Sequence, residues 1–187
     1  MPLPANYLKA MELLGQVCLE YRRASGGDDA WLVGGASVGI LTDGEFHSGD
    51  FDLVATDVAL FREILLKYGF QDERGQGRAR NMLQAGWMHP DHPDLGWQLV
   101  TGPLFDGKSD TSKKIAIELR TDSELTLPAV EDLIADRLGQ FAAQDGKSHH
   151  ELVDQARTLF RLANGIDQDY LKRRVVEDGG DLSLLFG

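Results

Sequence analysis

Apolar residues recur along this chain with two different spacings, and each spacing predicts a type of local structure. Several segments repeat them every three to four residues, as one face of an α-helix does, and short apolar runs bounded by Gly, Pro, Asn and Asp have the length of strands. We predict helices over 4–24, 36–41, 58–68, 148–163 and 167–177, together with one that Pro128 opens. We predict strands over 30–33, 51–55, 70–73, 82–88, 95–101, 113–120 and 124–127.

This order of elements predicts an α/β (α+β) fold, in which a short mixed β-sheet is flanked by helices and followed by a helical C-terminal part. The 187 residues suit one domain with a small helical extension. We place the α/β core with its N-terminal helix at 1–127 and the helical extension at 128–187. The cleft between the two parts is the expected site.

The residues with the clearest candidate function lie between positions 31 and 55. An apolar run stops at Gly34-Gly35, and a second run follows Asp50 and Asp52. In a strand, residues i and i+2 lie on the same face, so we expect the two carboxylates to lie together. Paired carboxylates suit a hard cation such as Mg²⁺, and a glycine turn lets backbone N–H groups approach phosphate.

Gly34-Gly35-x-Ser37, followed after twelve residues by Asp50-x-Asp52, resembles the signature of the nucleotidyltransferase-fold superfamily. Within it, the chain most resembles small bacterial abortive-infection and toxin–antitoxin nucleotidyltransferases. The resemblance implies that Gly34, Gly35 and Ser37 bind the triphosphate and that Asp50 and Asp52 are catalytic and bind Mg²⁺. It also implies Mg²⁺-dependent transfer of a nucleoside monophosphate from a nucleoside triphosphate to a hydroxyl of a small-molecule or protein acceptor, with release of pyrophosphate.

The resemblance also directs attention to positions outside the motif. Gln98 stands where the superfamily usually has a third carboxylate, and Glu118 is the rival candidate for that place. Ser48 fits the segment before the acidic pair, whereas Phe46 stands where a basic residue is common. Arg137 matches a basic residue that reaches toward the nucleotide. The two departures suggest an alternative, a catalytically weakened relative that binds a nucleotide or a partner.

Each of these residues also has a purely structural interpretation. Gly34-Gly35 would serve equally as a helix-entry turn, and Asp50 and Asp52 as a solvated strand entrance. Ser37 either donates to phosphate or caps a helix. Arg137 is either a ligand or a surface residue. The Gly/Arg segment at 74–80 is interpreted as a hairpin turn, and the His/Pro/Asp segment at 89–94 as a loop rather than a metal site.

The charge and composition of the chain limit the kinds of molecule that we expect it to bind. The net charge of −11 and the pI of about 4.8 oppose a large nucleic-acid footprint, so we expect a small-molecule or protein acceptor. No apolar run has the length of a membrane span, and no secretory signal is evident. The single cysteine, Cys18, lies in a helical apolar pattern, which suits a buried residue and the cytoplasm. A homodimer formed through the apolar tail and an antitoxin are the candidate protein partners.

Overall fold

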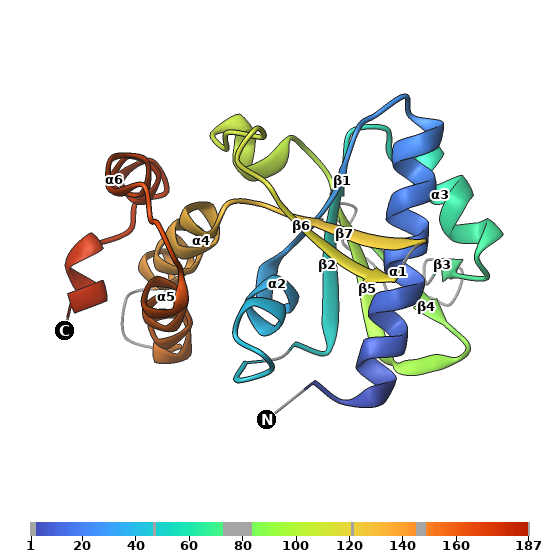
Figure 1. The fold of residues 1–187 in the computed structure, drawn as a ribbon, viewed down its shortest axis with the longest axis horizontal. Coiled ribbons are helices and arrows are strands. Elements are labelled where there is room, and N and C mark those ends of the chain that lie inside the picture. Colours follow the sequence, from blue (N-terminus) through green and yellow to red (C-terminus); the bar gives the residue numbers. More distant parts are fainter. Residues whose placement is uncertain (1–2, 47, 73–83, 121, 145–148, 187) are drawn as a thin grey trace.

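A computed structural model describes residues 3–46, 48–72, 84–120, 122–144 and 149–186. A seven-stranded mixed sheet forms its centre, in the order β3-β4-β5-β2-β1-β7-β6 (Figure 1). The strands are β1 (Ala30–Val33), β2 (Asp50–Ala55), β3 (Gln71–Asp72), β4 (Gln84–His89), β5 (His92–Val100), β6 (Ile115–Arg120) and β7 (Ser123–Leu127). β2 runs antiparallel to β1 and parallel to β5, whereas β1 and β7 run parallel. The predicted mixed sheet is therefore confirmed.

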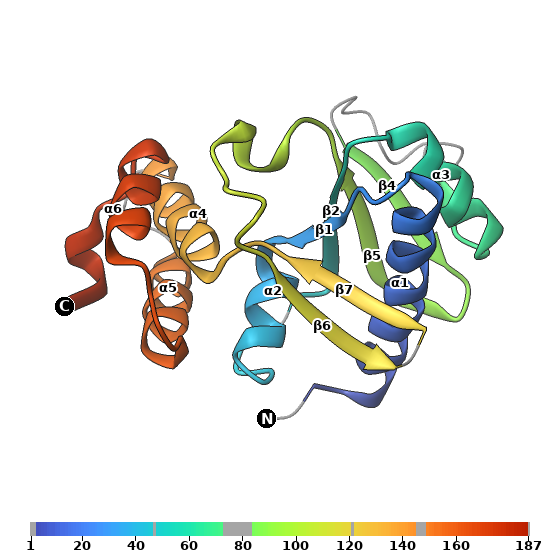
Figure 2. The ribbon, with the colours of Figure 1, turned by 45° about the horizontal axis from the view of Figure 1, so that its top comes forward.

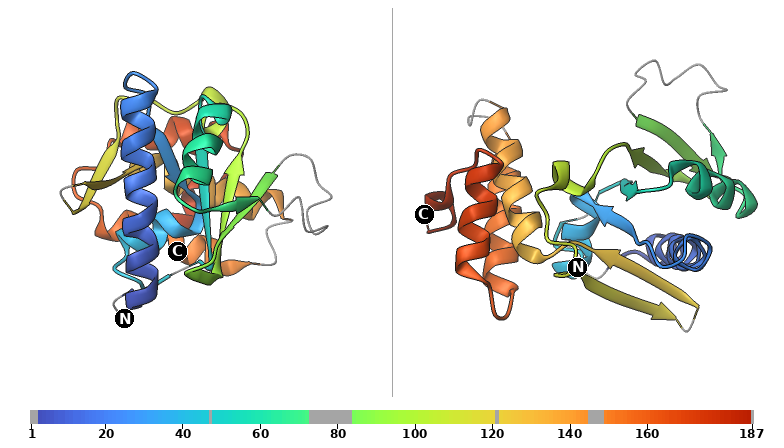
Figure 3. Two further views of the ribbon diagram at one scale, coloured as in Figure 1. Left: turned by 90° about the vertical axis from the view of Figure 1, so that its right-hand side faces the viewer. Right: turned by 90° about the horizontal axis from the view of Figure 1, so that it is seen from above.

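Two helices, α1 (Ala5–Ala24) and α3 (Val58–Lys67), lie side by side on one face of the sheet (Figure 3). Their apolar stripes meet Leu32 of β1 and Phe51 and Leu53 of β2 in the larger hydrophobic core. Cys18 is buried in this layer, as its position in the helical pattern predicts. Because side chains alternate along a strand, the residues between these positions face the other side of the sheet.

The other side of the sheet carries α2 (Gly34–Leu41), and beyond it lies the helical C-terminal part (Figure 2). That part consists of α4 (Val130–Ala143), α5 (His150–Leu162), α6 (Gln168–Glu177) and a final 3-10 helix, η3 (Leu182–Phe186). A second hydrophobic core fills this bundle, and Val38 of α2 and Leu185 of η3 are buried in it. α2 therefore joins the two cores, and the apolar tail docks on the bundle.

Three predicted boundaries are corrected. α2 begins at Gly34, so the two glycines form its first turn rather than a separate loop before it. β5 begins at His92, and His89 and His92 pair across a tight hairpin in place of the predicted loop. α4 begins at Val130, two residues after Pro128. The prediction for 74–80, and the start of the predicted strand over 82–88, lie outside the described residues.

The connection from β5 to β6 runs past the helical bundle and contains a short 3-10 segment, η2 (Leu104–Gly107). Leu104 is buried against Trp31, Val33 and Val54 on the α2 side of the sheet. This connection therefore borders the space between the sheet and the bundle. Within the described residues, no helix combines the length and the apolarity that crossing a bilayer requires.

Candidate active site

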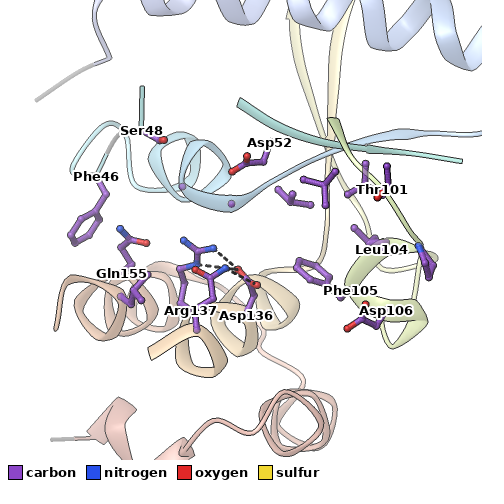
Figure 4. Close-up of a pocket in the computed structure, with 18 of the residues that line it drawn as sticks. Phe46, Ser48, Asp52, Thr101, Leu104, Phe105, Asp106, Asp136, Arg137 and Gln155 are labelled. Atoms are coloured by element: carbon purple, nitrogen blue, oxygen red, sulfur yellow. Dashed lines mark hydrogen bonds and ion pairs between the residues drawn. The ribbon is translucent and has the colours of Figure 1, made fainter. Parts of the chain in front are cut away.

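A cavity of about 600 Å³ lies between the sheet and the C-terminal helices (Figure 4). β1, β2 and the start of α2 form one wall, and α4 and α5 form the other. The segment after β5 supplies further lining residues. The full lining comprises Val33, Gly34, Gly35, Phe46, Ser48, Asp52, Val54, Val100, Thr101, Pro103, Leu104, Phe105, Asp106, Asp136, Arg137, Gln140, Glu151, Leu152 and Gln155. The expected cleft between the two parts is thus present.

β2 brings Asp50 and Asp52 to the face of the sheet that borders the cavity. Phe51 and Leu53 point into the core on the opposite face, so alternation places both carboxylates on the α2 side with Val54. Asp52 lines the cavity, whereas Asp50 is solvent-exposed and is not a lining residue. The carboxylate of Asp50 lies over Gly96 of β5, where a Cβ would overlap it. A side chain at Gly96 would require the exposed Asp50 carboxylate to turn away.

The carboxylate of Asp52 lies against the first residue of α2. Gly34 has φ of +71°, and a Cβ on it would overlap Asp52 Oδ2. Burial is the main cause that raises the pKa of Asp52, and the charges of Asp50 and Asp136 raise it further. Arg137 opposes them and lowers the pKa. A cation between the two carboxylates would relieve the same repulsion.

Gly35 and Ser48 also line the cavity, and Gly34-Gly35 opens a helix whose first N–H groups have no intrahelical partner. Ser48 Oγ accepts a hydrogen bond from the Asp50 backbone N–H at 3.1 Å, which fixes the entry to β2. Ser37 is placed elsewhere. Its side chain is fully buried, and its hydroxyl donates to the Leu32 carbonyl at 2.7 Å. The residue that caps α2 is Val33, so Ser37 neither caps the helix nor lines the cavity.

Arg137 reaches the cavity from α4 and is buried, with 6% of its surface exposed. Its guanidinium pairs with the carboxylate of Asp136 through Nε, at 3.1 Å, and through Nη2. Gln140 Nε2 donates to the same carboxylate at 3.1 Å. The guanidinium is thus held in place beside the cavity on the wall opposite Asp52 (Figure 4). The alternative of an exposed surface residue is wrong for Arg137.

Gln98 lies beside Asp52 in the parallel register of β2 and β5. Trp97 and Leu99 point into the core, so Gln98 is on the same face of the sheet as the two carboxylates. It is not among the residues that line the cavity. Glu118 is exposed on β6, at the far edge of the sheet and three strands from β2. Of the two candidates for the third carboxylate position, only Gln98 is next to Asp52.

The donor set fits a hard divalent cation held in part by substrate. Asp50 and Asp52 offer carboxylate oxygens on one face of β2, and Gln98 offers an amide oxygen beside them. Within the described ranges, no three His, Cys, Asp or Glu side chains come together as a metal site. Mg²⁺ in nucleotide sites commonly takes one or two carboxylates and completes its shell with phosphate and water. Two carboxylates therefore suffice for this role only with a bound nucleotide.

Sequence reasoning missed the lining residues of α5 and of the segment after β5. Glu151, Leu152 and Gln155 reach the cavity only because α5 packs beside α4. In Figure 4, Gln155 and Phe46 lie on one side of Arg137, and Phe105 lies on the other. Neither side has a sequence motif. Asp136 could have been inferred from the sequence as a lining residue, because it directly precedes Arg137.

The turn at Phe105 and Asp106 is strained. Both residues have positive φ, 45° and 57°, although neither is glycine. The left-handed region costs L-residues roughly 1–2 kcal/mol each, and a bulky residue there is unusual. Phe105 packs against both the bundle core and the smaller apolar cluster on the sheet. Packing around the turn therefore maintains a conformation that the chain alone disfavours.

Solved structures share the fold of this chain. An antigenic nucleotidyltransferase-like protein from Paracoccidioides brasiliensis aligns with a TM-score of 0.60 at 14% identity, over 95% of this chain and 89% of its own. ANT(2")-Ia in complex with adenylyl-2"-tobramycin gives a TM-score of 0.60 at 10% identity, over 91% and 97%. The solution structure of the antibiotic-resistance factor ANT(2'')-Ia gives 0.58 at 9% identity, over 90% of each chain. No family model and no curated protein sequence matches the chain. The chain therefore has the nucleotidyltransferase fold that its Gly-Gly-x-Ser and Asp-x-Asp motifs predict.

Proposed function

We propose that this protein is a nucleotidyltransferase that uses Mg²⁺ and a nucleoside triphosphate, with ATP as the first candidate. It transfers the nucleoside monophosphate to a hydroxyl of a small-molecule or protein acceptor and releases pyrophosphate. One observation carries the proposal. The carboxylate of Asp52 borders a cavity of about 600 Å³ beside the glycine turn of α2, on the wall opposite Arg137. This juxtaposition combines a carboxylate, backbone donors and a cation around one space.

Each group has a role that follows from its chemistry. Asp50 and Asp52 would hold Mg²⁺, which would neutralise phosphate charge and orient the reacting phosphate. The N–H groups at the start of α2 and the hydroxyl of Ser48 bind phosphate oxygens. Arg137 is held in place by Asp136 and stabilises negative charge on the transferred group. Ser37 would have to leave its contact with Leu32 to take part.

The acceptor hydroxyl also has to lose a proton. Gln98 lies beside Asp52 and can hydrogen-bond a hydroxyl, but a neutral amide does not act as a general base. The proton of the attacking hydroxyl would then pass to water in the cavity, and transfer would be slower than with a carboxylate base. ANT(2")-Ia is known in complex with adenylyl-2"-tobramycin, which supports a small molecule as the acceptor here.

The same glutamine supports a second candidate function. A relative with weakened catalysis would bind Mg²⁺ and nucleotide through Asp50 and Asp52 without efficient transfer. It would serve as a nucleotide-dependent sensor or as a partner-binding protein. An antitoxin or a second copy of the chain stays a prediction as its partner.

Both candidate functions require that the protein binds Mg²⁺ and nucleotide through Asp52, and substitution of this residue tests that requirement. Asp52→Asn removes one metal-ligating charge and keeps the shape, so we expect Mg²⁺·ATP affinity to fall at least tenfold in calorimetric titration. Asp28→Asn is the matched control, because it makes the same chemical change at an exposed residue outside the cavity. Equal affinity in the wild type and Asp52→Asn would exclude the proposed site.

Pyrophosphate release separates the enzyme from the weakened relative. Wild-type protein is incubated with labelled triphosphates, Mg²⁺ and cell lysate. Only an active transferase releases pyrophosphate and labels an acceptor, and Asp52→Asn should abolish both. Tight Mg²⁺·ATP binding without either product would favour the sensor.

A further inference from the structure

Gln155 places at the cavity wall a polar atom that the protein itself leaves unpaired. The residue lies in the middle of α5 and lines the main cavity. Its Oε1 atom is buried, and no donor among the described residues forms a hydrogen bond with it. The other buried, unpaired side-chain atoms of the described residues belong to Tyr7, Trp87 and Trp97, none of which lines the cavity. A buried acceptor without a partner costs free energy, which a donor on a ligand would recover.

Helix packing fixes the direction of the Gln155 side chain. Leu152, three residues before it, and Ala156, directly after it, are both buried, and α5 packs along α4. Residues three apart share one face of a helix, and Leu152 lines the cavity together with Gln155. This face of α5 therefore borders the cavity, and the amide of Gln155 is available to a molecule bound there.

The unpaired atom restricts what can bind beside it, because an amide oxygen accepts hydrogen bonds and does not donate them. Triphosphate oxygens are also acceptors and carry negative charge, so they do not satisfy Gln155 Oε1. The groups proposed to bind phosphate lie elsewhere on the walls, at the start of α2, at Ser48 and at Arg137. The complementary group is a neutral O–H or N–H donor. In a nucleotide, such donors belong to the ribose and the base.

A second lining residue on this side of the cavity suits a nucleoside. Figure 4 shows Phe46 on the same side of Arg137 as Gln155. The ring of Phe46 is partly buried against the bundle core and also lines the cavity. Aromatic rings stack on nucleobases of any sequence. This side of the cavity therefore combines a neutral acceptor with an aromatic surface.

We propose that Gln155 is a specificity-determining residue, whose Oε1 accepts a hydrogen bond from a neutral O–H or N–H group in the nucleoside half of the substrate. The triphosphate lies at the start of α2, and the ribose and base extend toward α5. The inference rests on the proposed function for the presence of a nucleoside triphosphate. It adds that α5, rather than the glycine turn, discriminates among nucleotides.

Analogues of ATP identify the donor, because the only neutral donors of ATP are its two ribose hydroxyls and its 6-amino group. The probes are 2′-deoxy-ATP, 3′-deoxy-ATP and purine riboside triphosphate, each of which lacks one of these groups. Affinity in the presence of Mg²⁺ is measured by calorimetric titration. We expect one analogue to bind wild type about three- to tenfold more weakly than ATP, which is the effect of one neutral hydrogen bond.

Gln155→Met assigns that loss to the amide, because methionine keeps the length of the side chain and lacks the acceptor. ATP and the affected analogue should bind this variant equally. Equal affinity of wild type for ATP and all the analogues, or a preference that persists in Gln155→Met, would overturn the proposal.

Gln155→Glu tests the direction of the hydrogen bond. A carboxylate still accepts from a neutral donor but repels phosphate, so this variant should keep the preference for ATP over the affected analogue even where its affinity for both falls. Loss of the preference in Gln155→Glu as well as in Gln155→Met would show that the amide acts as a donor, and the proposed contact would be wrong.

Stability supplies a readout that does not depend on nucleotide. Gln155→Met removes an unpaired buried acceptor, so we expect a higher Tm than wild type without ligand. Gln16→Met is the matched control, because it makes the same change at a partly buried glutamine of α1, on the other face of the sheet. It should leave the nucleotide preference unchanged. A lower Tm in Gln155→Met would show that the amide already has a partner in the free protein, and would overturn the proposal.

The inference and the proposed function fail in different ways. Mg²⁺·ATP binding that depends on Asp52 but shows no preference dependent on Gln155 would overturn the inference alone. Absence of Mg²⁺·ATP binding by wild type would overturn both.

Discussion

Asp52 is a residue whose environment opposes its charged form. It is partly buried beside Asp50, and these two effects raise its pKa more than Arg137 lowers it. A carboxyl with a raised pKa in the folded state binds its proton more tightly than the unfolded chain does. Its contribution to stability therefore falls as the pH rises from the unfolded value through the raised one. At neutral pH the charged carboxylate destabilises the metal-free protein, which is the pattern of a residue kept for function.

This linkage gives a prediction for Asp52→Asn without metal. The amide resembles the protonated carboxyl, so the variant should have a higher Tm than wild type at pH 7. The gain should disappear at a pH below the unfolded pKa of a carboxyl, where both forms are uncharged. Thermal unfolding across this pH range, in the presence of a chelator, measures it. A gain that is the same at every pH would show that charge is not its cause.

A second prediction concerns Gln98, which lies beside Asp52 on the neighbouring strand. Gln98→Asp adds a carboxylate to the face that carries Asp50 and Asp52. We expect Mg²⁺·ATP affinity to rise about tenfold, equivalent to ~1.4 kcal/mol, and metal-free stability to fall because like charges are closer. Calorimetry and urea unfolding measure the two effects. Unchanged metal affinity would place Gln98 outside the metal site.

At the scale of elements, the junction of β1 and α2 sets the geometry of the site. The chain leaves β1 and enters α2 at Gly34, whose positive φ and missing Cβ admit the carboxylate of Asp52. The glycines open the helix and line the cavity, and their binding of phosphate stays a prediction. A side chain at Gly34 would meet the backbone strain and the carboxylate at once.

Comparison of two glycines separates these costs. Gly26 also has positive φ, 83°, but has open space where a Cβ would lie. Gly26→Ala should therefore cost only the backbone term of about 1–2 kcal/mol. Gly34→Ala should cost about 1–3 kcal/mol more, because the methyl group overlaps Asp52. Urea unfolding measures both, and adding Asp52→Ala to Gly34→Ala should recover most of the difference. Equal costs for the two alanines would show that Asp52 can move aside freely.

At the scale of the whole molecule, the two hydrophobic cores are linked through α2. Val38 lies on α2, between β1 and β2 in the chain, but its side chain is fully buried in the core of the C-terminal bundle. Phe105 makes a similar link from the connection between β5 and β6. Residues on both sides of position 127 contribute to the cavity wall, and the division of the chain at this position stays a prediction.

Such a link predicts that the two parts unfold together. Val38→Ala removes two buried methyl groups and should cost about 2 kcal/mol. Because the chain is expected to unfold in one step, the urea midpoint should fall with an unchanged m-value. The urea midpoints measured from the sheet and from the helical bundle should fall by the same amount. Loss of the bundle signal ahead of the sheet signal would show that the bundle unfolds independently of the core.

The sequence by itself determined the fold class and indicated the residues of β2 and of the start of α2 that lie at the candidate site. The helical and strand periods and the alternation that pairs Asp50 with Asp52 are local properties, and the structure contains each of them. They are readable because adjacent residues fix the direction of a side chain on its own element.

Only the tertiary structure decided which residues of α5 and of the segment after β5 line the cavity. Packing of α5 against α4 brings Gln155 and Glu151 to the cavity, and no spacing in the sequence records that contact. The turn at Phe105 and Asp106 contradicts local preference at Phe105, since a bulky aromatic residue is rare at positive φ. Contacts with α4 and α6 support it, so it exists only in the folded protein. The burial of Ser37 against Leu32 likewise depended on how α2 lies on the sheet.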